Sequence, residues 1–156
     1  MPAGAFRRVA VAIDGSPAAE QALGTAIEVA GRFSAELLVI AIVPLPAVYV
    51  APNAPFVPTT VPGNLVDRFR ELVDAAVSKA RAAGVASVRG VCEEGPVVEG
   101  ILARVRSEGS DLLVVGSRGL SAAERLLLGS VSTGVVTHAP CPVLVVRPVT
   151  SPTASG

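Results

Sequence analysis

The sequence predicts an α/β fold in which an open parallel β-sheet carries helices on both faces. Five short apolar runs alternate along the chain with segments of helical periodicity. Hydrophobic residues make up 51% of the 156 residues and aromatic residues only 3%, so the core must consist of Val, Leu, Ile and Ala. These residues are typical of buried parallel strands and the helices that cover them. Strands that alternate with helices connect by right-handed crossovers, which makes the sheet parallel.

The first half of the chain is predicted to form strand, helix and strand. Residues 8–14 are an apolar run ending in an acid, and residues 15–17 supply a turn glycine, a serine N-cap and a first-turn proline. Apolar residues then recur at three- and four-residue steps over 19–33, which predicts an amphipathic helix. Residues 36–43 form a second buried strand. Six prolines over 44–62 exclude a regular helix and predict an extended connection.

In the second half, helical spacing returns over 65–80, with Gly84 expected at the C-cap. Residues 87–92 predict a weaker edge strand. The remaining elements are expected in this order: a third helix over 97–105 ended by Gly109, a strand over 111–116, a loop with a helical turn around 122–126, a short helix from 129–130 to His138, and a last strand over 141–147.

We expect one domain over residues 1–148, which includes the proline-rich loop 44–62, and a loose C-terminal tail over 149–156. Basic and acidic residues balance at 13 each, which argues against a nucleic-acid partner. Residues 1–8 contain no apolar signal segment, and prolines interrupt the apolar stretch 37–51, so no membrane span is expected. With two distant cysteines and no CxxC pair, the chain is predicted to be a reduced cytoplasmic protein.

The strongest chemical signal is the spacing Gly116-x2-Gly119-x9-Gly129-Ser130. Glycines let a backbone approach phosphate closely, and successive N–H groups form a concave anion site. A helix that begins at the Gly-Ser pair adds free amides and a favourable dipole. Ser130 and Ser132 can donate hydroxyl hydrogen bonds to phosphate, and Arg118 can pair with its charge.

This motif resembles the nucleotide-binding signature of the universal stress protein family. The resemblance also covers the strand ending in Asp14-Gly15-Ser16, the strand 111–116 and the closing segment 138–146. It implies a Rossmann-like, adenine nucleotide alpha hydrolase-like sheet of five parallel strands in the order 3-2-1-4-5, and a homodimer paired through the last strand. It also implies ATP as the ligand. Mg²⁺ is expected to accompany ATP, if at all, through phosphate oxygens and water, since the sequence indicates no protein ligand for it. The residues carried over by position are Ala12, Asp14, Ile42, Gly116, Arg118, Gly119, Gly129, Ser130, Val131 and Ser132.

Five of these residues also have a structural interpretation. Gly116 and Gly119 can be turn glycines, Ser130 a plain N-cap, Asp14 a turn residue and Arg118 a solvated loop cation. The downstream Gly-Ser pair at fixed spacing favours phosphate binding over ordinary turns.

Other chemistry-bearing residues are assigned structural roles. His138 lies near a helix C-terminus, where a cation is favoured, and no nucleophile is paired with it. Cys92 and Cys141 are expected to be buried small hydrophobes on opposite sheet edges. Glu93 and Glu94 are expected in a turn, solvated rather than binding a metal.

The function that these features favour is nucleotide binding with a regulatory or stress-response role. One alternative is a weak ATPase or phosphotransferase, although the loop supplies Arg118, Glu124 and Arg125 without a Walker lysine or paired acids. Another is an interaction module without nucleotide. A Rossmann dehydrogenase is disfavoured because residues 14–19 lack GxGxxG.

Overall fold

The structure is a computed structural model that describes residues 6–45, 53, 62–117 and 128–148. Most of the proline-rich segment 44–62, the expected helical turn around 122–126 and the tail 149–156 lie outside the described residues. The helices and strands follow in this order: β1 (Arg8–Ala12), α1 (Pro17–Phe33), β2 (Glu36–Pro44), α2 (Gly63–Ala82), β3 (Val88–Gly95), α3 (Val97–Glu108), β4 (Leu112–Gly116), α4 (Ser130–His138) and β5 (Val143–Val146).

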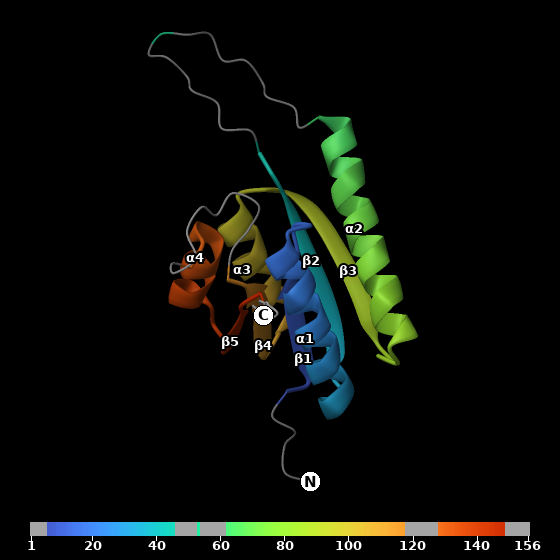
Figure 1. Cartoon of the computed structure of the whole chain (residues 1–156). Coiled ribbons are helices and arrows are strands. Elements are labelled where there is room, and N and C mark those ends of the chain that lie inside the picture. The colour runs from blue at the N-terminus through green and yellow to red at the C-terminus, as the bar shows by residue number, and fades with distance from the viewer. Residues whose placement is uncertain (1–5, 46–52, 54–61, 118–127, 149–156) are drawn as a thin grey trace, which may run out of the picture.

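The five strands form one parallel sheet in the order β3-β2-β1-β4-β5, which confirms the predicted topology. Helices α1 and α2 cover one face, and α3 and α4 cover the other (Figure 1). Along β1 the alternation of a strand is visible, since Val9 and Val11 pack under α1 and α2 while Ala10 packs under α3 and α4. Both faces are therefore buried, as the apolar runs predict.

Local sequence signals set the ends of the helices. Ser16 caps α1 by accepting a hydrogen bond from the Ala19 amide at 3.2 Å, with Pro17 at the first helical position. Helix α2 ends at Ala82, and Gly84 follows with a φ of +95°, so the predicted glycine terminates it in a left-handed conformation. Helix α3 ends in the same manner at Gly109, with a φ of +64°.

Several strand ends differ from expectation, and β1 for example stops at Ala12 rather than at Asp14. Strand β3 is an edge strand as predicted, but it continues to Gly95, which pairs with Pro44 because β2 supplies partner backbone over its full length. Glu93 and Glu94 consequently lie in this strand, and the expectation that they lie in a turn is wrong. Glu93 forms an ion pair with Arg104 of α3. Strand β5 is shorter than predicted and spans only Val143–Val146.

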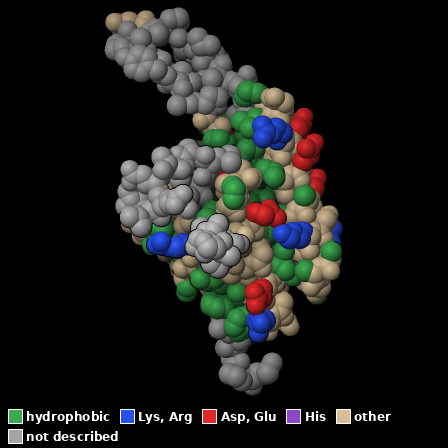
Figure 2. Space-filling view, viewed as in Figure 1, with side chains coloured by type: hydrophobic (Ala, Val, Ile, Leu, Met, Phe, Trp, Pro, Cys, Tyr) green, Lys and Arg blue, Asp and Glu red, His purple; other side chains and the backbone are tan. Residues whose placement is uncertain are grey.

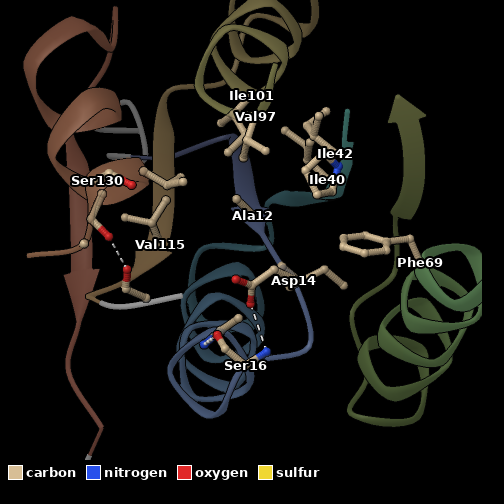
Figure 3. A pocket seen from close by; sticks show the side chains of 17 residues that line it. Ala12, Asp14, Ser16, Ile40, Ile42, Phe69, Val97, Ile101, Val115 and Ser130 are labelled. Atoms are coloured by element: carbon tan, nitrogen blue, oxygen red, sulfur yellow. Dashed lines mark hydrogen bonds between the residues drawn. The ribbon is translucent and has the colours of Figure 1, made fainter. Parts of the chain in front are cut away.

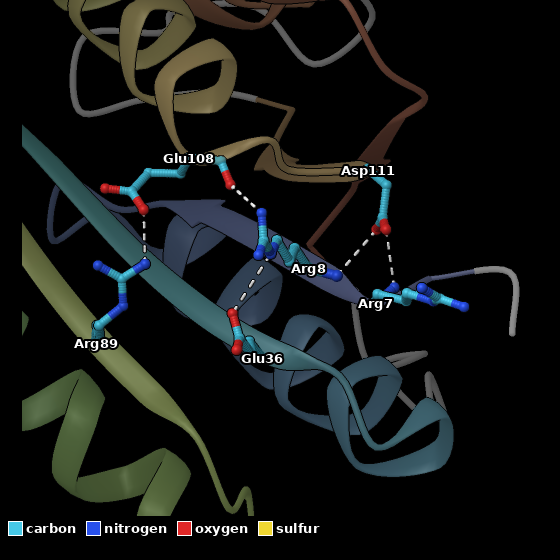
Figure 4. Close-up of polar contacts among 6 residues, drawn as sticks. All are labelled: Arg7, Arg8, Glu36, Arg89, Glu108 and Asp111. Carbon is cyan, nitrogen blue, oxygen red and sulfur yellow. Dashed lines mark hydrogen bonds and ion pairs between the residues drawn. The ribbon is translucent and has the colours of Figure 1, made fainter.

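A polar network lies at the amino ends of the strands (Figure 4). The Asp111 carboxylate accepts hydrogen bonds from the backbone amides of Arg7 and Arg8 at 2.9 and 3.1 Å, which joins the starts of β1 and β4. Arg89 donates to the Glu108 carboxylate at 2.6 Å, and this bond lowers the pKa of Glu108 and raises that of Arg89. The network ties the sheet together at the end opposite the carboxyl ends of the strands.

Charges on the surface are mixed rather than segregated. Figure 2 shows acidic and basic side chains interspersed over one face of the molecule. One contact on the surface is the Lys79–Glu20 ion pair at 2.8 Å, which joins α2 to α1. None of the helices within the described ranges is both long and apolar enough to cross a membrane.

Candidate functional site

A cavity of about 340 Å³ opens at the carboxyl ends of β1, β2 and β4. Its volume lies within the roughly 300–1,000 Å³ typical of small-molecule sites. The cavity lies where the strand order reverses between β1 and β4, the usual ligand position in open parallel sheets. The described residues that line it are Ala12, Ile13, Asp14, Ser16, Ala19, Ile40, Ile42, Pro44, Phe69, Val97, Ile101, Val115, Gly116, Gly129, Ser130, Val131 and Ser132.

The turn between β1 and α1 places Asp14 at the middle of the cavity. Asp14 Oδ1 accepts a hydrogen bond from the Ser16 amide at 2.9 Å, and Gly15 between them has a φ of +86°, a conformation that favours glycine. Figure 3 shows the second carboxylate oxygen directed away from this turn. The turn therefore fixes the Asp14 side chain through Oδ1. The second carboxylate oxygen points away from the hydrogen bond with Ser16.

The start of α4 forms the polar end of the cavity. The Gly129 amide donates to the Ser117 carbonyl at 2.8 Å, and the Ser132 hydroxyl donates to the Gly116 carbonyl at 2.5 Å. These bonds fasten the helix start to the end of β4. The first amides of a helix have no intrahelical acceptor, so those of Ser130, Val131 and Ser132 provide donors for an anion.

Ser132 is held differently from the sequence-based expectation. Its side chain is buried, with 3% exposed, and its single hydroxyl proton is already donated to the Gly116 carbonyl. A serine hydroxyl has one O–H donor, so Ser132 offers its backbone amide to a ligand rather than that proton. Ser130 is exposed at the same helix start, and its hydroxyl is the one placed to donate.

Gly116 has a packing role in addition to its place in the motif. A Cβ atom at this position would lie 2.7 Å from the carbonyl carbon of Ala18 and 2.8 Å from its oxygen. These are backbone atoms of the first turn of α1, so no side-chain rotation relieves the overlap. A glycine here is required for β4 and α1 to pack, whether or not a ligand binds.

The opposite end of the cavity is apolar. Ile40 and Ile42 reach it from β2, Val97 and Ile101 from α3, and Phe69 from α2. Figure 3 shows Ser130 and Val115 on one side, the isoleucines and Phe69 on the other, and Asp14 between them. The cavity thus changes along its length from helix-start amides, through one carboxylate, to hydrocarbon and an aromatic ring.

The sequence profile of the universal stress protein family matches residues 5–147. The chain belongs to the universal stress protein family. A Staphylococcus haemolyticus protein named for the family is 36% identical over 145 residues, covering 91% of this chain and 85% of its own. A Bacillus subtilis universal stress protein is 33% identical over 150 residues, covering 91% of this chain and 99% of its own.

A solved structure of a universal stress protein in complex with cAMP has the same fold. It is 25% identical to this chain, with a TM-score of 0.68, and the match covers 92% of this chain and 98% of that one. That relative therefore binds an adenine nucleotide.

This universal stress protein brings eight of the ten sequence-predicted residues to the cavity lining: Ala12, Asp14, Ile42, Gly116, Gly129, Ser130, Val131 and Ser132. Arg118 and Gly119 lie outside the described residues. The lining residues that the motif did not indicate are mostly apolar, and Phe69 is the most distinctive. The helical spacing of apolar residues predicts only that Phe69 lies in the core. A local pattern does not show which core residue borders a cavity.

The other candidate groups lie apart from the cavity. Cys92 and Cys141 are free thiols, half-buried, and desolvation raises the pKa of each above its usual value. His138 ends α4, where one ring nitrogen lies 3.1 Å from the Gly134 carbonyl. In the described part of the chain, no group of three or more His, Cys, Asp or Glu side chains is placed to hold a metal ion.

Proposed function

We propose that this protein binds an adenine nucleotide, in the first instance ATP, and acts as a regulatory stress-response binding protein. The observation that carries the proposal is the order of chemistry along the cavity. Amides at the α4 start suit an anion, the Asp14 carboxylate suits hydroxyl or amino donors, and the apolar end suits a flat base. This order matches phosphate, ribose and base along one nucleotide.

The phosphate end rests on the helix start and on the motif residues next to it. A negative charge at an exposed helix N-terminus gains about 0.3–1 kcal/mol. Ser130 adds a hydroxyl donor at this point. We propose that Arg118 and Gly119 complete the cradle, as the motif implies, and that Mg²⁺ accompanies ATP through phosphate oxygens and water. The cAMP complex of a relative supports an adenine nucleotide as the ligand class.

The direct experiment is to denature the purified protein and identify any released small molecule by chromatography and mass spectrometry. An adenine nucleotide in near-stoichiometric amount supports the proposal. Titration of ligand-free protein with ATP then gives the affinity. If ATP does not bind and no nucleotide is released, the proposal is wrong.

Variants separate the phosphate cradle from the fold. Gly119→Val should abolish ATP binding, because a side chain would fill the space that the backbone leaves for phosphate. Gly31→Val is the matched control, since Gly31 lies in α1 with no atom within 4 Å of an added Cβ. Unchanged ATP affinity in Gly119→Val would contradict the assignment of this loop to phosphate.

Ser130→Ala provides a second test at a described residue. Removing the Ser130 hydroxyl takes away one hydrogen-bond donor to phosphate and should lower ATP affinity by about 5- to 10-fold. Because the Ser130 side chain is exposed, the stability of the fold should change little. An affinity equal to that of the unsubstituted protein would remove Ser130 from the site.

The lining favours binding over catalysis. Phosphoryl transfer needs a metal held in place and a group that orients the nucleophile. Asp14 is the single ionisable side chain among the described lining residues. A weak ATPase is the alternative, and sustained multiple turnovers at saturating ATP that Asp14→Asn or Ser130→Ala abolishes would establish it. An interaction module without nucleotide would instead show neither ATP binding in the titration nor ATP turnover.

We also propose a cytoplasmic homodimer paired through β5. This strand is a sheet edge, and Leu144 on it is 37% exposed, while Val136 on the neighbouring α4 is 46% exposed. An open edge flanked by apolar side chains favours pairing with a second chain. Light scattering should give the mass of two chains, and Leu144→Lys should shift the mass toward that of one chain.

The free thiols of Cys92 and Cys141 fit the proposed cytoplasmic location, because the cytoplasm keeps thiols reduced.

A further inference from the structure

Phe69 is the aromatic side chain of the described cavity lining, in a chain that has few aromatics. The sequence contains four phenylalanines and one tyrosine. Phe6 and Phe33 pack edge-to-face against each other, with ring centroids 5.4 Å apart, and neither borders the cavity. Phe69 instead reaches from α2 toward Ile40 and Ile42 at the apolar end (Figure 3).

Helix α2 presents this ring from a fixed position. A Cβ added to Gly90 of β3 would overlap with Val73, so the helix lies as close to the strand as a glycine allows. One turn from Phe69, Leu72 Cδ1 would lie 3.2 Å from a Cβ on Gly15, which places the helix against the turn that holds Asp14. The Lys79–Glu20 ion pair joins the far half of α2 to α1.

The ring is mostly enclosed by protein. Phe69 is 6% exposed and packs with the buried residues under α1 and α2, yet it also borders the cavity. A side chain held by packing presents its free surface to a ligand without loss of rotamer entropy, which is the arrangement expected of a specificity residue. Around it the cavity end is aliphatic, so contact with the ring is the only π interaction that the described lining offers a base.

We propose that Phe69 is a specificity-determining residue for the base, and that its ring gives the site a preference for purine over pyrimidine nucleotides. This inference rests on the proposed function. Stacking of a base on an open aromatic ring contributes roughly 1–3 kcal/mol, and the largely enclosed ring of Phe69 should contribute no more than the lower end of that range. A bicyclic purine offers a larger face than a pyrimidine ring, so a purine gains more from the same contact.

The test compares affinities for ATP and CTP in the unsubstituted protein and in Phe69→Leu, measured by calorimetric titration. Leucine keeps an apolar side chain but removes the ring. We expect the ATP affinity to fall roughly 2- to 5-fold, because only a small part of the ring faces the cavity, the CTP affinity to fall less, and the ATP-to-CTP preference to decrease accordingly. Phe69→Tyr, which keeps the ring, should retain the preference.

Phe6→Leu is the matched control, because it makes the same change in an aromatic pair away from the cavity. It should leave both affinities unchanged. Thermal unfolding of each variant shows whether the folded population is the same at the titration temperature.

The outcomes separate this inference from the proposed function. If the unsubstituted protein binds ATP and Phe69→Leu keeps the full preference, the role of Phe69 is wrong while nucleotide binding stands. Equal losses for ATP and CTP would mean that Phe69 only supports the shape of the site, which also overturns the inference. If the unsubstituted protein binds neither nucleotide, the proposed function and this inference fail together.

Discussion

Replacing Gly116 with alanine separates the structural role of this motif glycine from its role toward a ligand. The added methyl group would lie 2.7 Å from the Ala18 carbonyl carbon, 2.8 Å from its oxygen and 2.9 Å from its Cβ. Two of these three atoms are backbone atoms in the first turn of α1. The clash can therefore be relieved only by moving β4 away from α1.

The size of the effect follows from two opposing contributions. Forcing an extra methyl group into a well-packed contact costs about 1–3 kcal/mol. Alanine in a strand regains about 0.5–1 kcal/mol relative to glycine through lower chain entropy in the unfolded state. The two contributions leave a net loss of about 0–2.5 kcal/mol, and because the overlap is with backbone atoms that no rotamer change relieves, we expect Gly116→Ala to lower the free energy of unfolding by about 1–2 kcal/mol.

Gly24→Ala is the matched substitution with the opposite expected sign. Gly24 lies inside α1 and is exposed, with no atom within 4 Å of an added Cβ, so alanine there should stabilise the protein by about 0.5–1 kcal/mol. For a chain of this length, a difference of about 2 kcal/mol between the two variants corresponds to roughly 4–8 °C in Tm.

The assay is urea unfolding followed by circular dichroism, performed on ligand-free protein so that ligand affinity does not contribute. If Gly116→Ala is as stable as the unsubstituted protein, the contact with Ala18 does not constrain the fold. The glycine would then have to be explained by the ligand alone.

Three further predictions concern charge, thiols and helix capping. Because Arg89 lowers the pKa of Glu108, the pair stabilises the fold at neutral pH, and this contribution should be lost as the pH falls through the lowered pKa. Urea unfolding should therefore separate Glu108→Gln from the unsubstituted protein more at pH 7 than at pH 3, and an equal separation at both would contradict this. Burial raises the pKa of Cys92 and Cys141, so both thiols should react slowly with iodoacetamide at pH 7.5 and faster as the pH rises, and rapid labelling at pH 7.5 would contradict this. Ser16→Ala removes the α1 cap and should lower the free energy of unfolding by about 0.5–2 kcal/mol, with no change in the unfolding midpoint as the contrary result.

The architecture could be predicted from the sequence because its signals are local and repeated. Apolar runs, helical spacing and the cap residues Ser16 and Gly109 each depend on neighbours within a few residues. The end of β3 could not be predicted in this way. Its continuation past Glu93 to Gly95 depends on the length of β2, a partner far away in the sequence, and acidic residues before Gly-Pro resemble a turn.

The polar half of the candidate site could be placed from the sequence, whereas the apolar half could be predicted only at Ala12 and Ile42. Asp14 and the Gly129-Ser130 pair belong to motifs with fixed spacing, so their positions follow from the chain itself. Phe69 and Ile101 come from helices whose apolar faces look like ordinary core. Which core residues border a cavity is decided by how far the helices stand from the sheet, a quantity that no local pattern contains.

An intact motif is weaker evidence for nucleotide binding than its spacing alone implies, because the fold itself uses several motif residues. Gly116 is required for packing against Ala18, and the Ser132 proton binds the Gly116 carbonyl with no ligand involved. Asp14 likewise holds the turn before α1 through the Ser16 amide. A universal stress protein that had lost its ligand would still need these residues. Evidence for binding must therefore come from groups that the described fold does not need, above all the exposed hydroxyl of Ser130, whose removal should affect the ligand and not the stability.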